Sequence, residues 1–150
     1  MITSDAITWT APNDSHPARI ASQRSYSAVA KGDLAEFLTV YAEDAVIEDP
    51  VGPSMFDPEG KGHRGHEGIL AFWKLVIEPL GRFEFEIYES FANPGSNACA
   101  NVGRIKTSFP DGSRMTIDLV MVYVVNDDGR VASLKAFWEP GRVMPSFATG

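Results

Sequence analysis

The chain has one cysteine, Cys99, among its 150 residues. A single cysteine excludes an internal disulfide and any cysteine-based metal cluster. We expect it to be a small buried side chain in a strand. The sequence also lacks an apolar run of about 18 residues and an amino-terminal segment in which basic residues precede apolar ones. We therefore expect neither a membrane span nor a signal peptide, and we place the protein in the cytoplasm.

Basic residues are also scarce, since 13 Lys and Arg face 20 Asp and Glu for a net charge of -7. This negative charge opposes binding to a phosphate backbone, so we expect no nucleic-acid partner. Apolar residues make up 44% and aromatic residues 11% of the chain, enough for a core or an apolar cavity. At this length we expect one domain, residues 15–150, after an irregular leader over residues 1–14. A small apolar ligand is the favoured partner.

Three amphipathic helices are predicted in the first half of the chain. Ser15 and Pro17 favour a helix start, and Gly32 ends the helix that follows over residues 18–30. Asp33 then caps a second helix. Its apolar stripe, at spacing i, i+3, i+4 and i+7, is Leu34, Phe37, Leu38 and Tyr41. The third helix ends at Gly81, and its stripe is Ile69, Phe72, Trp73, Val76 and Leu80.

Four strand-like segments follow the third helix, over residues 83–91, 98–109, 115–125 and 131–138. The joints between them are rich in Gly, Pro, Asn and Asp, which is typical of hairpin turns. Helices first and then an antiparallel meander is an α+β pattern. We predict that three amino-terminal helices pack on a curved antiparallel sheet.

An additional strand, ending at Asp49 and Pro50, carries the candidate catalytic residue. Alternation puts Ala45, Ile47 and Asp49 on one face, so a buried Ile47 takes Asp49 into the interior with it. A buried carboxylate needs a compensating role. Asp-Pro is also ordinary turn chemistry, so Asp49 is either a turn residue or a functional carboxylate.

Several motifs together resemble the Δ5-3-ketosteroid isomerases, which have the nuclear transport factor 2-like (SnoaL-like, cystatin-like) fold. The matching motifs are Gly32-Asp33-Leu34, Tyr41-Ala42, residues 46–52, Phe72-Trp73 and residues 128–138. The resemblance implies a cone-shaped open barrel with a ligand cavity, and a homodimer joined through the outer face of the meander. It implies no cofactor. It also implies that Asp49 is the general base.

The resemblance further implies roles for side chains around Asp49. Trp138 matches an aromatic residue that lines the steroid pocket, and Tyr41 matches a tyrosine in a polar network behind the catalytic site. Phe72, Trp73 and Met121 are further candidates for the lining. Plain packing in the core accounts equally well for these large side chains.

The two donors that hold the enolate oxygen in the resembled family are replaced here. The donor tyrosine falls on Ser25, and Tyr26 lies about 100° further around the helix. The donor aspartic acid falls on Met121, whereas Asp118 points to the opposite face. We expect Asp118 to face solvent and Tyr26 to be either a core tyrosine or a substitute that binds the ligand. One missing donor lowers turnover about a hundred- to a thousandfold, so any isomerase activity should be weak.

Residues 53–65 form a Gly- and Pro-rich loop that is longer than in well-studied bacterial isomerases and resembles actinobacterial ones. A metal site at His63 and His66 would need more ligands at matching spacing, so we expect no metal and solvated histidines. Met55 and Phe56 are candidates for a lid, because loops of this size are often functional.

Four functions remain open from the sequence. The favoured one is a weak steroid Δ-isomerase that uses Asp49 as its base. The second is a non-catalytic module that binds a steroid or another polycyclic ligand. The third is a hydratase, epoxide hydrolase or polyketide cyclase on the same fold. The fourth is a protein-interaction module, which would need an exposed apolar patch.

Overall fold

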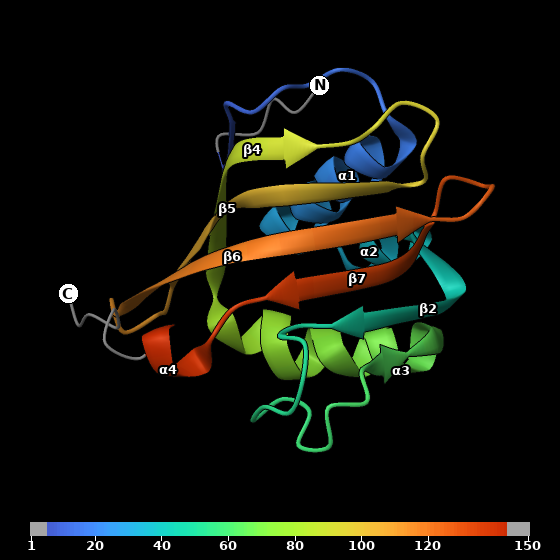
Figure 1. The fold of residues 1–150 in the computed structure, drawn as a ribbon. Coiled ribbons are helices and arrows are strands. Elements are labelled where there is room, and N and C mark those ends of the chain that lie inside the picture. Colours follow the sequence, from blue (N-terminus) through green and yellow to red (C-terminus); the bar gives the residue numbers. More distant parts are fainter. Residues whose placement is uncertain (1–5, 144–150) are drawn as a thin grey trace.

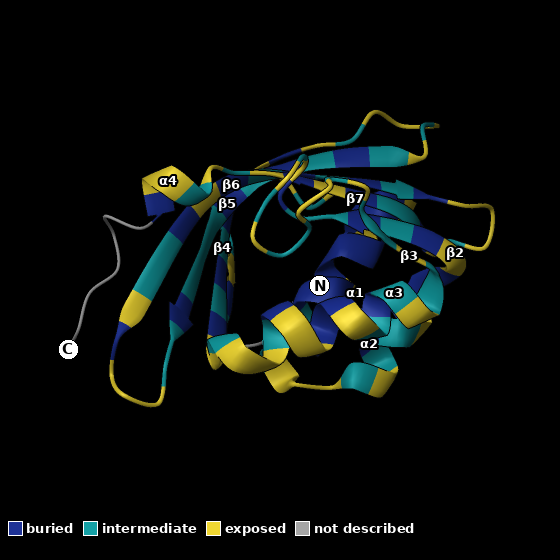
Figure 2. Cartoon of the chain, turned by 90° about the horizontal axis from the view of Figure 1, so that it is seen from below, coloured by how far each residue is buried: buried dark blue, intermediate teal, exposed yellow. Residues whose placement is uncertain are grey.

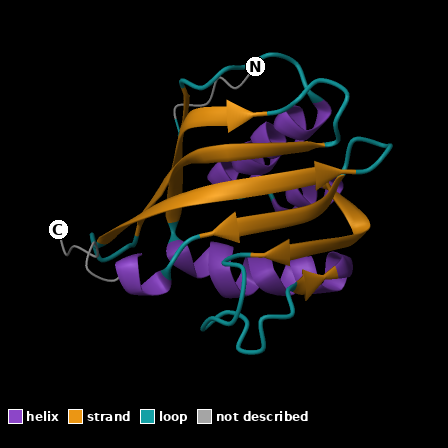
Figure 3. Ribbon diagram, viewed as in Figure 1, coloured by secondary structure: helices purple, strands orange, loops and turns teal. Residues whose placement is uncertain are grey.

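The computed structural model describes residues 6–143, in which the helices of the first half of the chain cover one face of a curved seven-stranded sheet (Figures 1 and 3). The strands are β1 (Ile7–Trp9), β2 (Tyr41–Glu48), β3 (His63–Arg64), β4 (Arg82–Phe91), β5 (Ala98–Ser108), β6 (Arg114–Val125) and β7 (Val131–Phe137). The helices are α1 (Pro17–Lys31), α2 (Leu34–Val40), α3 (Gly65–Phe72) and α4 (Pro140–Val143). A π-helical turn (Trp73–Ile77) and a 3-10 turn (Glu78–Leu80) extend α3. The α+β prediction is confirmed.

The first two helices begin and end at residues with specific capping chemistry. The Nδ1 atom of His16 accepts a hydrogen bond from the Ala18 amide at 3.1 Å, so His16 caps α1 in place of the predicted Ser15. Gly32 ends α1 in the left-handed region, at φ 66°, where a side chain would be strained. Asp33 caps α2 as predicted, accepting from the Glu36 amide at 3.0 Å. The turn between the helices is therefore fixed by two adjacent residues.

Tyr41 lies in a strand and not on the second helix. It is extended, at φ -100° and ψ 139°, and begins β2 by pairing with Val131 of β7. The helical spacing of Leu34, Phe37, Leu38 and Tyr41 therefore ends one residue early, because sheet pairing takes Tyr41 out of the helix. Tyr41 is still fully buried, as the sequence suggests.

The meander β4–β5–β6–β7 is antiparallel, as predicted, and each end of it is extended by a parallel pairing. The full order is β1-β4-β5-β6-β7-β2-β3. On one side β2 runs parallel to β7, and on the other β1 runs parallel to β4. The predicted irregular leader over residues 1–14 therefore contains a strand at residues 7–9, which is too short to show a periodicity; residues 1–5 lie outside the described part.

The loop after Asp49 returns to the sheet through β3, which pairs with β2 at Ile47 and His63. The two histidines at its end are only partly exposed, whereas solvated histidines were predicted. The Nε2 atom of His63 is buried, and the ring centroid lies 5.2 Å from that of Phe72. The Nε2 atom of His66 lies 2.9 Å from the carbonyl oxygen of Tyr41. Pairing of β3 with β2 places His63 beside Ile47, and His66 follows in the first turn of α3.

The core fills the space between the helices and the concave face of the sheet, where the buried residues gather in Figure 2. Cys99 is buried in β5, as expected. None of the described helices combines the length and the apolar character needed to cross a membrane. A cytoplasmic location stays a prediction.

Gly103 in β5 gives a direct test of this packing, because a Cβ atom there would collide with the carbonyl oxygen of Glu86 and lie 3.0 Å from Cδ1 of Ile87. We expect Gly103→Ala to lower stability by about 1–3 kcal/mol, since backbone on the neighbouring strand cannot yield cheaply. Thermal denaturation measures the change. Gly141→Ala is the matched control, because no atom lies within 4 Å of the added methyl. Equal melting temperatures for the two variants would contradict the described register.

Candidate active site

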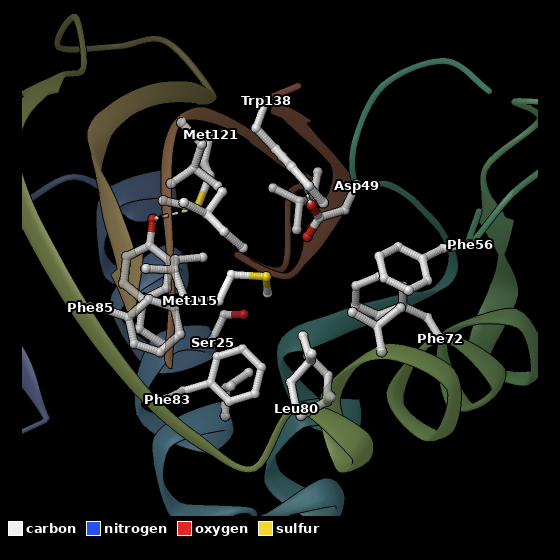
Figure 4. Close-up of a pocket in the computed structure, with 18 of the residues that line it drawn as sticks. Ser25, Asp49, Phe56, Phe72, Leu80, Phe83, Phe85, Met115, Met121 and Trp138 are labelled. Carbon is white, nitrogen blue, oxygen red and sulfur yellow. Dashed lines mark hydrogen bonds between the residues drawn. The ribbon is translucent and has the colours of Figure 1, made fainter. Parts of the chain in front are cut away.

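A cavity of about 310 Å³ lies between the helices and the concave face of the sheet. Its size is within the range of small-molecule sites, roughly 300–1,000 Å³. The walls are mainly apolar and come from α1, α3 and its extension, β4–β7 and the loop after β2 (Figure 4). The polar side chains in the lining are Ser25, Tyr26, Tyr41, Asp49, Tyr123 and Trp138. Such a site favours an apolar ligand that is oriented by a few polar contacts.

Asp49 reaches the cavity because β2 ends at Glu48 and the chain then bends. A cis peptide bond joins Asp49 to Pro50, and the Val51 amide donates to the carbonyl oxygen of Ala136 at 2.9 Å. This contact fixes the end of β2 beside the end of β7. Trp138 follows β7, and its Nε1–H donates to Oδ1 of Asp49 at 2.6 Å. The parallel pairing of β2 with β7 thus brings the two side chains together.

Burial in the apolar cavity raises the pKa of Asp49 to about 6, and the hydrogen bond from Trp138 opposes this rise by stabilising the carboxylate. At neutral pH the group is mostly deprotonated. It nevertheless holds a proton more tightly than an ordinary aspartate does. A group with this pKa is suited to accept a proton from a ligand and to return it.

Ser25 and Tyr41 form a buried hydrogen bond, with 2.9 Å between Oγ and Oη. Burial raises the pKa of Tyr41 above its ordinary value, so its hydroxyl stays protonated. Tyr26 also reaches the cavity although it follows Ser25 on α1. Its hydroxyl accepts from Nδ2 of Asn101 at 3.0 Å and lies 3.6 Å from Sδ of Met121. Tyr26 is therefore both a core residue and part of the lining.

The structure separates the remaining candidates. Phe72 and Met121 line the cavity. The prediction that Trp73 lines it is wrong, because Trp73 lies about 100° around the helix from Phe72 and packs against Phe37, with ring centroids 4.9 Å apart. Asp118 lies on the outer face of β6 and forms an ion pair with Arg104 at 3.2 Å, as strand alternation predicts.

Three further residues belong to the lining of the cavity. The sequence predicts two of them only as candidates for a lid and does not predict the third. Met55 and Phe56, the candidate lid residues, do line the cavity. Tyr123 lines it too, and its hydroxyl lies 3.9 Å from Sδ of Met121. The signal for Tyr123 was present, since alternation in β6 places it on the same face as Met121. Among residues 6–143, no group of three or more His, Cys, Asp and Glu side chains forms a possible metal site.

Comparison with known proteins places the chain in a family, because residues 22–134 match the SnoaL-like domain. The chain belongs to the SnoaL-like domain family. A steroid Δ-isomerase from Nocardioides simplex is 29% identical over 123 residues, which cover 82% of this chain and 90% of that protein. This similarity confirms the resemblance to steroid isomerases that the sequence motifs indicate.

Two solved structures are also similar to this SnoaL-like domain. The Δ5-3-ketosteroid isomerase from Mycobacterium sp. is 30% identical with a TM-score of 0.80, covering 91% of this chain and 100% of that chain. RV0760c from Mycobacterium tuberculosis is 29% identical with a TM-score of 0.81, covering 93% of this chain and 100% of that chain. RV0760c has also been solved in complex with estradiol-17β-hemisuccinate.

The raised pKa of Asp49 predicts a pH-dependent stability. The folded pKa of about 6 exceeds the ordinary 3.8, so the ionised carboxylate destabilises the fold above pH 6 and this effect disappears below about pH 4. We expect Asp49→Asn to stabilise this SnoaL-like domain by up to about 3 kcal/mol at pH 8 and by little at pH 4. Thermal denaturation at the two pH values measures the difference.

Asp118→Asn is the matched control, because it removes a carboxylate that is exposed on the outer face. Its effect on the melting temperature should be small at both pH values. A gain in stability for Asp49→Asn that is equal at pH 4 and pH 8 would contradict the raised pKa.

Proposed function

We propose that this protein binds a flat apolar ketone of steroid size and isomerises it weakly, with Asp49 as the general base. The observation that carries the proposal is a carboxylate in an apolar cavity, held by Trp138 at 2.6 Å, with its pKa raised to about 6. The likeness to steroid isomerases supports it. The substrate class we infer is a β,γ-unsaturated 3-ketosteroid or a similar enone precursor.

In the proposed step, the Asp49 carboxylate accepts a proton from the carbon between the carbonyl and the double bond. The electron pair of that C–H bond forms a new double bond, and charge passes to the carbonyl oxygen to give a dienolate. Asp49 then returns the proton to the far carbon of the former double bond, and the carbonyl re-forms as a conjugated enone. The apolar walls limit exchange of the proton with water.

The lining supports a flat ligand with few polar groups. Phe72, Phe83 and Phe85 provide aromatic surface, and Met55 and Phe56 add apolar contacts from the loop after β2. Large ring surfaces of this kind contribute strongly to the binding of apolar ligands.

A second candidate function is binding of a polycyclic ligand without turnover. The favouring observation concerns the two positions at which the resembled enzymes have their oxyanion donors. Met121 stands at one of them and has a weak acceptor but no donor. Ser25 stands at the other and is already bonded to Tyr41. The complex of RV0760c with an estradiol derivative is consistent with binding in such a fold.

The decisive test of the enzyme is Asp49→Asn, followed by conversion of a Δ5-3-ketosteroid in an ultraviolet assay. We expect turnover to fall at least about a hundredfold, since a positioned base contributes that much, while steroid affinity is kept or improved because a buried charge is removed. In the wild type, kcat/KM should rise as pH increases through about 6, where Asp49 loses its proton. Unchanged turnover in the variant would refute the base; binding without conversion by the wild type would favour the second function.

We also infer a homodimer joined through the face of the sheet that points away from the helices. Apolar side chains gather there, with Phe91 61% and Phe137 47% exposed. Alternation in β6 adds Val120, Val122 and Val124, which are only partly buried. An exposed apolar patch of this kind is typical of a protein interface.

Val122→Lys tests the dimer, because it places among these apolar side chains a charge that the neighbouring Lys135 cannot neutralise, and we expect a shift to monomer in sedimentation velocity. Lys74→Glu is the control, since Lys74 is exposed on the helical side. A wild type that sediments as a monomer at all concentrations would contradict the inference.

A further inference from the structure

Two phenol hydroxyls converge on one thioether at the wall of the cavity. The hydroxyl oxygen of Tyr26 lies 3.6 Å and that of Tyr123 3.9 Å from Sδ of Met121. The two rings meet edge to face, with centroids 5.9 Å apart. All three residues line the cavity, and Figure 4 shows Met121 at its wall. A thioether is a weak acceptor. The two hydroxyls also interact with each other, and the sulfur is a poor partner for them at a point that a ligand can reach.

The hydrogen bonds behind Tyr26 determine where its proton points. The Asn101 side chain is fully buried, and its Oδ1 accepts from Ser90 Oγ at 2.7 Å. Its Nδ2 must then be the end that donates to Tyr26 at 3.0 Å and to Ser22 Oγ at 2.9 Å. Because Tyr26 accepts from Asn101, its own proton is directed away from Asn101, on the side of Met121.

The same row of hydrogen bonds starts at a buried cation. Arg19 is 5% exposed, and its Nε donates to Ser90 Oγ at 2.9 Å. Its other two bonds go to the carbonyl oxygens of Asp14 and Ser90. Every donor from Arg19 through Ser90 and Asn101 to Tyr26 points the same way, so the bonds polarise one another. The Tyr26 hydroxyl is thereby made a better donor.

The hydroxyls of Ser25 and Tyr41 are the other candidates in the lining. They bond to each other at 2.9 Å, so one of the two donates to the other's oxygen and only one O–H of this pair is left for a ligand. This pair therefore offers a ligand oxygen one donor, whereas two hydroxyls face the sulfur of Met121.

We propose that Tyr26 and Tyr123 bind the carbonyl oxygen of the ligand after the flexible Met121 side chain turns aside, and that Asn101 positions Tyr26. The proposal rests on the proposed function, since it names the groups that hold the oxygen while Asp49 moves the proton. Met121 has the freedom to move because its side chain is unbranched. The two phenols replace only in part the donors that Ser25 and Met121 do not provide, so turnover stays weak.

The test compares a 3-keto-4-ene steroid with its 3-deoxy counterpart, because a carbonyl oxygen accepts and cannot donate. The readout is the ratio of the two dissociation constants, called here the oxygen preference. We expect Tyr26→Phe and Tyr123→Phe each to lower the oxygen preference about fivefold, the effect of one net hydrogen bond. Met121→Ala should raise it, since the competing sulfur is gone. Tyr88→Phe is the control, because Tyr88 is 43% exposed outside the cavity lining.

A second readout tests the positioning role of Asn101. Hydrogen bonds from the phenols should lower the infrared stretching frequency of a 13C-labelled steroid carbonyl in the wild type. Asn101→Leu should move that frequency part of the way back towards the free value while affinity for the deoxy steroid is kept. A frequency that does not change in this folded variant would overturn the role of Asn101.

The outcomes separate this proposal from the proposed function. If Tyr26→Phe and Tyr123→Phe fold and keep the wild-type oxygen preference, the donor pair is wrong, whatever Asp49→Asn does to turnover. If the oxygen preference falls but Asp49→Asn keeps full turnover, Tyr26 and Tyr123 are the donors and the assignment of Asp49 as the base is wrong. If the wild type binds neither steroid, both proposals are wrong.

Discussion

The hydrogen bond from Trp138 to Asp49 is the contact on which the site depends, because it is what holds an ionisable group inside an apolar cavity. It requires two strands far apart in the sequence to end at the same place. β2 and β7 meet this requirement by running parallel, with Ile47 beside Leu134. The amide of Val51 then secures the bend by bonding to Ala136. The site is therefore a consequence of the strand order.

The polar row from Arg19 to Tyr26 joins the two layers of the fold. Arg19 and Tyr26 belong to α1, Ser90 to β4 and Asn101 to β5, so the row crosses from helix to sheet and back. Buried polar groups destabilise a core unless they find partners, and here each makes at least one hydrogen bond. Apolar packing alone would allow α1 to shift along the sheet. These hydrogen bonds form only when α1 lies in one position. The helix that carries Ser25 and Tyr26 is thus held in position by polar contacts.

The helices and strands that have a long periodic pattern could be predicted from the sequence, and so could the inward position of Asp49. The meander and the inward face of Asp49 follow from alternation, and Asp33 follows from capping chemistry. The misses have physical causes. Helical spacing continues by chance into Tyr41, where sheet pairing prevails, and β1 is too short to show a period. The burial of the His63 Nε2 atom and the packing of Trp73 on Phe37 depend on contacts between distant segments.

The short strands at the two borders of the sheet also bear on how this protein behaves at high concentration. β1 has three residues and lies along β4, and β3 has two and lies along β2. A long bare border would present a row of free amide and carbonyl groups on which another chain could add as a strand. Here each border ends in a ladder of only two or three residues. Growth of fibres from the outermost strands β1 and β3 is thus disfavoured, although the inner strands are rich in valine.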